Sequence, residues 1–234
     1  MGKSGKRYEN AKAKIEAGKR YSLEEAMTMV VQSATAKFDE SVDVSVKLGV
    51  DATQSDQQVR GGVALPNGLG KTIRIAVFAK GEKENEAKNA GADIVGGDDL
   101  VQKINEGWME FDKIIATPDM MATVSKVAKI LGPRGLMPNP KVGTVTFEVG
   151  KAVSTEKKGK LDFRIDKAGI IHASIGRKSM GPEKLRENFS SFLSAVIKAK
   201  PATSKGVYLQ GVTLSSTMGP GVKLDLTRAQ VETA

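Results

Sequence analysis

The stretch IRIAVFA, residues 73–79, decides the fold class, because it is almost continuously apolar. A strand of this kind is typical of a parallel sheet that is buried on both faces. Two further strand-like stretches follow, DIVG at 93–96 and DKIIATPD at 112–119, and segments of helical composition separate the three. The alternation of strands and helices predicts an α/β unit, in which helices cover the faces of a parallel sheet.

The helices of this unit are recognised by their ends. The first two are expected to stop at Gly91 and Gly107, since glycine commonly terminates helices. The third is expected to begin with Thr117 as its cap and Pro118 in its first turn, and to run on to Gly132. A glycine- and proline-rich segment follows, and a last helix is expected across 145–158.

The two ends of the chain show a different pattern. Ser22 and Glu25 have the spacing of a capping box at the start of an amphipathic helix. Residues 42–50 then alternate between apolar and polar side chains, which predicts a strand with one buried and one wet face. After residue 160 the alternation returns. The pattern there predicts a hairpin around Lys167–Gly169, a helix over 182–200, and strands at 206–214 and 221–226.

These patterns predict an α/β protein of two domains. Residues 1–66 and 160–234 are expected to form one split α+β domain, and residues 67–159 an inserted Rossmann-like α/β domain. The chain would then cross between the domains twice, near 66–68 and 158–160, and glycines at such crossings favour a hinge.

The chain is basic, with 36 lysines and arginines against 27 acidic residues and a formal net charge of +9. The excess is uneven: residues 160–234 carry twelve basic and six acidic side chains, a net charge of +6. Such a surface favours a polyanionic partner such as nucleic acid. The segment KSGKR, Lys3–Arg7, is expected to act as a mobile basic arm. No apolar run is long enough for a membrane span or a secretory signal, so the expected location is the cytoplasm.

The alternative is a nucleotide-dependent enzyme on the inserted sheet. LPNGLGKT at 65–72 ends like a phosphate-binding loop, but it has Leu65 where that loop needs glycine, and a strand rather than a helix follows. The chain has no cysteine and its one histidine, His172, cannot form a multi-histidine metal site. No catalytic residue, cofactor or metal ligand is predicted.

Three features fit an RNA surface, and each also has an ordinary structural explanation. Phe38 is either a core residue or a ring exposed at the edge of a basic surface. His172 shares one face of its strand with other small or polar residues, facing either solvent or an RNA backbone. The neutral loop SSTMGPG, residues 215–221, is either a tight turn or a donor-rich element that approaches a ribose closely.

Four segments resemble the family of large-subunit ribosomal protein one. They stand in the family's order: AKFDESVDVSVKLGVD at 36–51, LGPRGLMPNPKVGTVT at 131–146, GIIHASIGRKSM at 169–180 and LSSTMGPG at 214–221. The resemblance covers nearly the whole chain. The sequence departs from the family at Met180, where phenylalanine is usual.

The resemblance implies a structural protein of the large ribosomal subunit, monomeric when free of the ribosome. Its implied partners are the large-subunit rRNA stalk, tRNA leaving the exit site, and the messenger RNA of its own operon, whose translation it would repress. It also implies that the RNA surface lies on the split domain. Carried over to this sequence, that surface consists of Lys37, Phe38, Ser41, Lys167, His172, Ser215, Thr217, Met218 and Gly219.

Overall fold

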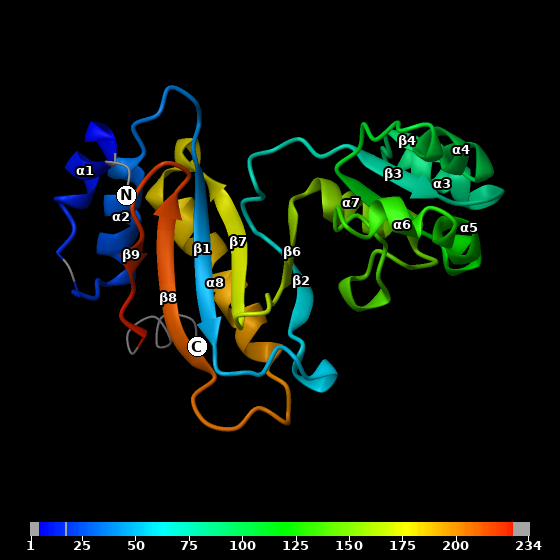
Figure 1. The fold of residues 1–234 in the computed structure, drawn as a ribbon. Coiled ribbons are helices and arrows are strands. Elements are labelled where there is room, and N and C mark those ends of the chain that lie inside the picture. Colours follow the sequence, from blue (N-terminus) through cyan, green and yellow to red (C-terminus); the bar gives the residue numbers. More distant parts are fainter. Residues whose placement is uncertain (1–4, 17, 227–234) are drawn as a thin grey trace. The chain divides into compact units, whose positions relative to one another are not determined.

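The structure is a computed structural model that describes residues 5–16 and 18–226, and the chain divides into two compact units. One unit combines residues 1–70 with 161–234 and is called the split unit here. The other, Lys71–Lys160, is called the inserted unit. Figure 1 shows the elements of both units in chain colours. The expected mixture of helices and sheets is confirmed.

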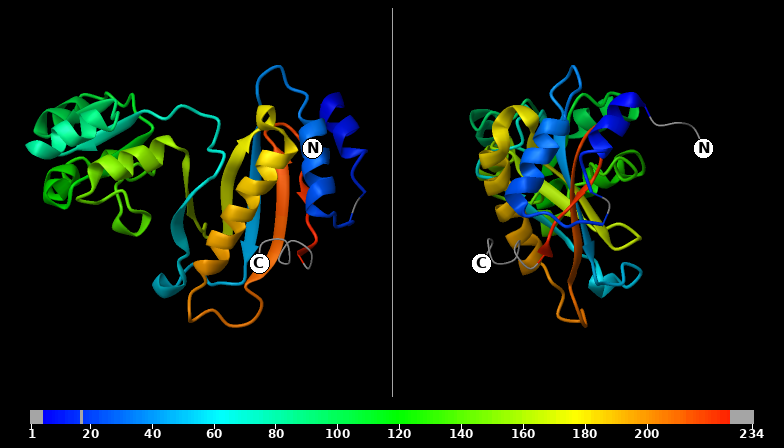
Figure 2. Two further views of the ribbon diagram at one scale, coloured as in Figure 1. Left: turned by 180° about the vertical axis from the view of Figure 1, so that it is seen from behind. Right: turned by 90° about the vertical axis from the view of Figure 1, so that its left-hand side faces the viewer.

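A four-stranded antiparallel sheet in the order β7-β1-β8-β9 is the centre of the split unit. Helices α2 and α8 cover one of its faces, and in Figure 2 they lie in front of the strands when the unit is seen from behind. No helix among the described residues covers the other face, which is called the wet face here. The elements of this sheet and its helices are α1 (Lys6–Lys12), α2 (Leu23–Ser33), β1 (Ser41–Leu48), β7 (Ile170–Arg177), α8 (Gly181–Lys198), β8 (Leu209–Ser216) and β9 (Val222–Lys223).

Local sequence explains two of these elements. The Ser22 hydroxyl accepts from the Glu25 amide at 3.3 Å and the Glu25 carboxylate accepts from the Ser22 amide at 3.2 Å, so the predicted capping box is confirmed. Strand β1 alternates strictly, with Val42, Val44 and Val46 fully buried. The buried valines pack against the helices, and the residues between them face the wet side.

The predicted hairpin around 167–169 is only partly right. The turn exists, but β6 (Lys160–Arg164) pairs with β2 (Arg60–Ala64) in a separate two-stranded sheet, and a single bridge between Ile165 and Ile171 joins it to β7. Strand β2 was missed because its two glycines are unfavourable in strands. At Gly61 a side chain would lie 2.9 Å from the ring of Phe163, so the pairing requires glycine there.

The inserted unit has a parallel three-stranded sheet in the order β4-β3-β5, as the apolar stretches predict. Strand β3 is the centre, and all four of its residues are buried. Helix α7 packs beside α3 and against β5, while α4 and α5 contact each other. The elements are β3 (Ile75–Phe78), α3 (Glu82–Asn89), β4 (Ile94–Gly96), α4 (Asp98–Asn105), β5 (Lys113–Ala116), α5 (Met121–Ser125), α6 (Ala128–Leu131) and α7 (Val149–Lys157), with one-turn 3-10 helices η2 (Pro118–Met120) and η3 (Pro140–Val142).

Three expectations about helices need correction. The helix expected over 118–131 is broken into η2, α5 and α6, because Val127 leaves the helical conformation, and Thr117 makes no side-chain cap. The last helix of the inserted unit begins at Val149 rather than Val145. In the basic segment Lys3–Arg7, residues 3 and 4 lie outside the described residues, and Lys6 and Arg7 are the start of helix α1 rather than an arm. None of the helices in the described residues is long and apolar enough to span a bilayer.

Candidate nucleic-acid interface

Three chain segments meet at one end of the wet-faced sheet. They are the loop into β1, the end of β7 with the 3-10 turn η4 (Lys178–Met180), and the end of β8. The sheet register brings them together, because Ser41 pairs with Arg177 on one side and Val42 pairs with Ser216 on the other. We call residues 34–41, 177–180 and 215–219 the sheet-end cluster.

A buried carboxylate holds the sheet-end cluster together. Glu40 is 1% exposed, and its two oxygens accept from the Ala36 amide at 2.7 Å and the Met218 amide at 3.0 Å. Its carbonyl accepts from the Lys178 amide at 2.9 Å. Burial by itself would raise the pKa of Glu40, but the amide donors stabilise the anion more, and the pKa lies below its ordinary value. The Glu40 side chain thus ties the loop into β1 to the end of β8, and its backbone carbonyl holds the start of η4.

Two of the three basic residues of the sheet-end cluster, Arg177 and Lys178, are also fixed. The Arg177 guanidinium donates to the Asp39 carbonyl at 2.8 Å, and the Lys178 ammonium donates to the Ala34 carbonyl. The Asp39 carboxylate accepts from the hydroxyl and the amide of Ser179, at 2.7 and 3.1 Å, and the hydroxyl is the larger cause of its lowered pKa. Two cations are therefore held at the surface in defined positions.

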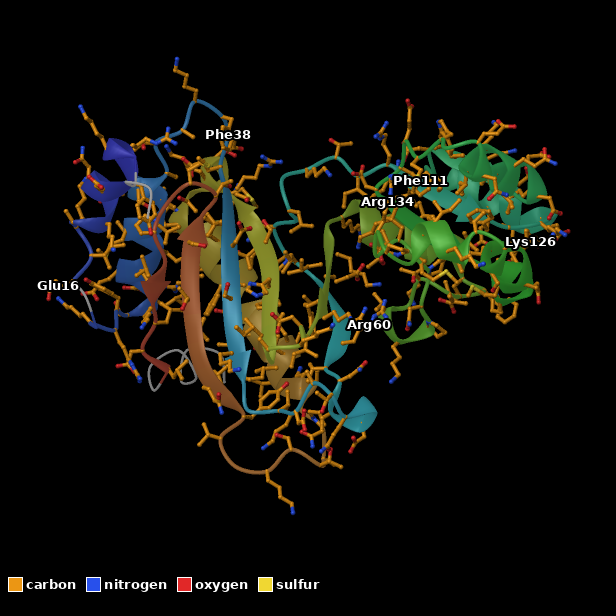
Figure 3. The ribbon with its side chains drawn as sticks, viewed as in Figure 1. Glu16, Phe38, Arg60, Phe111, Lys126 and Arg134 are labelled. Atoms are coloured by element: carbon orange, nitrogen blue, oxygen red, sulfur yellow. The ribbon has the colours of Figure 1, made fainter. Side chains whose placement is uncertain are left out.

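Phe38 and Met218 are exposed apolar side chains in this cluster, 54% and 51% exposed. Figure 3 labels Phe38 in the loop that leads into β1, at the end of the sheet. Lys37 beside it is also exposed. This arrangement rules out the core interpretation of Phe38, and it gives the cluster a ring and a flexible thioether facing outward.

The Thr217 hydroxyl joins two segments. It accepts from the Ser41 amide at 2.9 Å and lies 2.9 Å from the Ser41 hydroxyl, while the Thr217 amide donates to the Ser41 carbonyl at 3.1 Å. Ser215 faces the wet side next to Asp43 in the register. The loop is thus both of the things that its sequence suggested: a turn between β8 and β9, and a neutral surface of hydroxyls.

The structure gives a packing reason for glycine at position 219, which the sequence did not reveal. A side chain there would collide with the Ser216 hydroxyl and would lie 3.1 Å from the Ser33 hydroxyl. The expected reason was close approach to RNA. The packing against Ser216 is sufficient to require glycine, so the loss of binding in a bulky variant would not by itself indicate an RNA contact.

This packing predicts the stability of a variant pair. Gly219→Ala should lower the free energy of unfolding by about 1–3 kcal/mol, the usual cost of overpacking. Ser216→Ala removes the nearest colliding atom, so Gly219→Ala should cost less in the Ser216→Ala background. Urea denaturation of the two single variants and the double variant measures this coupling. Additive effects, or a Gly219→Ala variant as stable as the wild type, would contradict the packing explanation.

Lys167 and His172 are not part of the sheet-end cluster. Strand β7 runs antiparallel to β1, so the turn that contains Lys167 lies at the opposite end of the sheet, where the Lys47 ammonium donates to the Ala168 carbonyl. His172 lies between the two ends on the wet face. Its Nδ1 is 3.1 Å from the Ser45 hydroxyl and its Nε2 is 3.6 Å from an oxygen of Asp166. The predicted residues therefore follow the length of the wet face instead of forming one patch.

Asp166 organises that distant turn. Its carboxylate accepts from the amides of Ala168 and Ile170, at 2.9 and 2.8 Å, and the amide of Ile170 is the main cause of its lowered pKa. Lys167 is left exposed at the tip.

The enzyme alternative finds no support in the geometry. The loop at 65–72 leads into β3, so it lacks the following helix that a phosphate-binding loop requires. Within residues 5–16 and 18–226, no group of three histidine, aspartate or glutamate side chains is placed to hold a metal ion. In the proline-rich segment of the inserted unit, Arg134 is exposed.

Comparison with known proteins gives a consistent result. Residues 30–220 match the model of the ribosomal protein L1p/L10e family. The chain is 64% identical over 230 residues to the large ribosomal subunit protein uL1 of Bdellovibrio bacteriovorus, covering 98% of each chain. It is 56% identical over 225 residues to the protein of the same name from Solidesulfovibrio magneticus, covering 96% of each.

Proposed function

The chain belongs to the ribosomal protein L1p/L10e family, and on this premise we propose that its sheet-end cluster and wet face bind the stalk of large-subunit rRNA. Its relatives are proteins of the large ribosomal subunit, so this protein is a non-enzymatic component of that subunit and its partner is large-subunit rRNA. Its place is therefore the ribosome in the cytoplasm.

The observation that carries the proposal is the pair of exposed apolar side chains on the sheet-end cluster. Phe38 and Met218 lie beside fixed cations and hydroxyls, on segments that Glu40 holds in place. RNA-binding surfaces use exposed rings to stack on bases, and a flexible thioether provides an adaptable apolar contact beside the ring. The surrounding lysines and arginines supply the attraction to phosphates.

The hydroxyls would recognise the shape of the RNA. Serine and threonine hydroxyls can donate to and accept from a ribose 2′-OH. Ser41, Ser215 and Thr217 present such groups along the end of the sheet, and His172 continues the polar surface toward Lys167. The charges would then give affinity, and the neutral loop would give discrimination between RNA structures.

We further propose the two finer roles that the resemblance implies. One is contact with tRNA leaving the exit site, and the other is repression of the protein's own operon through a messenger RNA that mimics the rRNA site. Both would use the same surface, so a messenger RNA and an rRNA fragment should compete for one molecule of protein. A ternary complex of the two RNAs with the protein would contradict a shared site.

RNA binding is expected to depend steeply on salt. Each phosphate contact contributes about 0.7–0.9 to the slope of log affinity against log salt. Lys37→Gln and Lys167→Gln should each lower the slope by about that amount, because the two lysines are exposed at opposite ends of the wet face. Filter binding of a stalk rRNA fragment across a salt series measures the slopes.

Lys184→Gln is the matched control, since Lys184 is exposed on α8, on the face of the sheet opposite the wet face. Its slope should equal that of the wild type. A flat salt dependence of the wild type would contradict the proposal. An unchanged slope for Lys167→Gln would restrict the RNA surface to the sheet-end cluster and remove Lys167 from it.

A further inference from the structure

A groove lies at the β9 edge of the sheet, between α1 with its following linker and the end of the β8–β9 loop. Its volume is about 300 Å³. One wall carries Tyr8, Lys12 and Lys19, and the other carries Pro220, Gly221 and Lys223. We call it the β9 groove.

Backbone hydrogen bonds between Tyr21 and the segment that contains β9 hold the two walls of the β9 groove together. The Tyr21 amide donates to the Lys223 carbonyl at 3.0 Å, and the Asp225 amide donates to the Tyr21 carbonyl at 2.9 Å, so the linker continues the sheet beyond β9. The Tyr21 hydroxyl accepts from the Glu16 amide at 2.9 Å. The groove is thus a fixed part of the split unit.

The β9 groove is basic. Three lysines line it against one carboxylate, Glu16, which Figure 3 labels on the linker after α1. Glu16 forms an ion pair of 3.1 Å with Lys19, but both side chains are at least half exposed, so the pair neutralises the groove only weakly. A second depression of about 190 Å³ shares Lys223 and adds Arg20. The two together form a cationic edge.

The β9 groove is continuous with the sheet-end cluster. Pro220 and Gly221 line it and directly follow Gly219 in the chain. The Tyr8 side chain is 37% exposed, so an aromatic ring is available beside the cations. A polyanion that covers Thr217 and Met218 needs only to continue over the loop to reach Lys12, Lys19 and Lys223.

We infer that the β9 groove binds the sugar–phosphate backbone of the same RNA, in the segment that leaves the sheet-end cluster. The inference rests on the proposed function, because it takes the cluster as the first RNA contact. It adds Lys12, Lys19 and Lys223 as phosphate contacts and Tyr8 as a stacking ring. None of these residues was among those predicted from the sequence.

The test compares two triple variants that lose the same charge from the split unit. The groove variant is Lys12→Gln, Lys19→Gln and Lys223→Gln, and the control is Lys184→Gln, Lys198→Gln and Lys205→Gln. Affinity for a stalk rRNA fragment is measured across a salt series. The groove variant should lower the log–log slope by about 1.4–2.7, two to three phosphate contacts, and the control should leave it unchanged. Tyr8→Leu should weaken binding without changing the slope.

A hydroxyl-radical footprint on the RNA provides the second readout. The groove variant should lose protection at one end of the protected region and keep it where the sheet-end cluster binds. Equal slopes and equal footprints for the two triple variants would overturn the inference. So would a groove variant that binds RNA like the wild type but no longer binds phosphatidylglycerol vesicles, since the groove would then be a site for anionic lipid.

The two proposals fail in different ways. If Phe38→Ala and Met218→Ala bind RNA like the wild type, the sheet-end cluster is not the RNA site and the proposed function of that surface fails first. If those variants lose affinity while the groove variant matches its control, only the β9 groove is excluded.

Discussion

Glu40→Gln is expected to lower the free energy of unfolding of the split unit by about 2–4 kcal/mol and to weaken RNA binding with it. The carboxylate accepts from two amides on different segments, and a glutamine amide has only one oxygen, so one buried donor would face an NH₂ group. The loops that carry Lys37 and Met218 would then lose their common anchor.

The measurement is urea denaturation followed by two signals. The single tryptophan, Trp108, belongs to the inserted unit, so its fluorescence should keep its midpoint. Far-UV circular dichroism follows both units and should show an earlier transition. Glu16→Gln is the control, because Glu16 is exposed and its replacement should change stability by less than about 0.5 kcal/mol.

The stabilisation that Glu40→Gln removes should depend on pH. The pKa of Glu40 is lowered in the folded state, so the unfolded chain binds the proton more readily and stability rises with pH. The contribution should be complete above the ordinary pKa of 4.5 and should be lost as the pH falls through the lowered native value. The difference in stability between wild type and Glu40→Gln should therefore shrink below about pH 4.5. A constant difference down to pH 3 would exclude the carboxylate as its cause.

The sequence correctly predicted the elements whose own apolar periodicity shows which of their residues are buried. Strand β1 and the capped helix α2 have periodicities that the structure reproduces, and the continuous apolar strand β3 identified the inserted parallel sheet. Each of these needs only a buried face and its own hydrogen bonds. The sequence is sufficient there because propensity and packing agree.

The elements that depend on distant partners could not be predicted. Strand β2 is stabilised by β6, about a hundred residues later, and its Gly61 makes sense only beside Phe163. The helix over 118–131 has good helical spacing, yet it breaks at Val127. The resemblance grouped Lys167 with the other site residues, but only the strand register shows that it lies at the opposite end of the sheet.

Glu40 shows the same limit within the candidate site. In sequence it is one of two adjacent acidic residues before a strand, a common surface pattern. Its burial and its two amide partners, at positions 36 and 218, result from the sheet register. The sequence pointed to the exposed residues of the interface. It did not point to Glu40, which holds those residues in place.

Replacing the two exposed apolar side chains of the sheet-end cluster should have the largest effect on RNA binding. Phe38 and Met218 are each about half exposed, so their truncation to alanine removes little buried area and should leave stability nearly unchanged. Stacking on a base contributes about 1–3 kcal/mol per ring. The double variant should therefore lose at least about tenfold in affinity for RNA. No charge is removed, so the salt slope should stay the same.

The inserted unit offers a matched control, because Phe147 is also 54% exposed, with the Lys83 ammonium 4.6 Å from its ring centre. The central claim is that the sheet-end cluster is the RNA surface. The most direct measurement is the affinity of Phe38→Ala/Met218→Ala and of Phe147→Ala for a stalk rRNA fragment, with thermal unfolding to confirm that both remain folded. We predict a loss of about tenfold or more for the first variant and none for the second. Wild-type affinity in a folded Phe38→Ala/Met218→Ala variant would contradict the account.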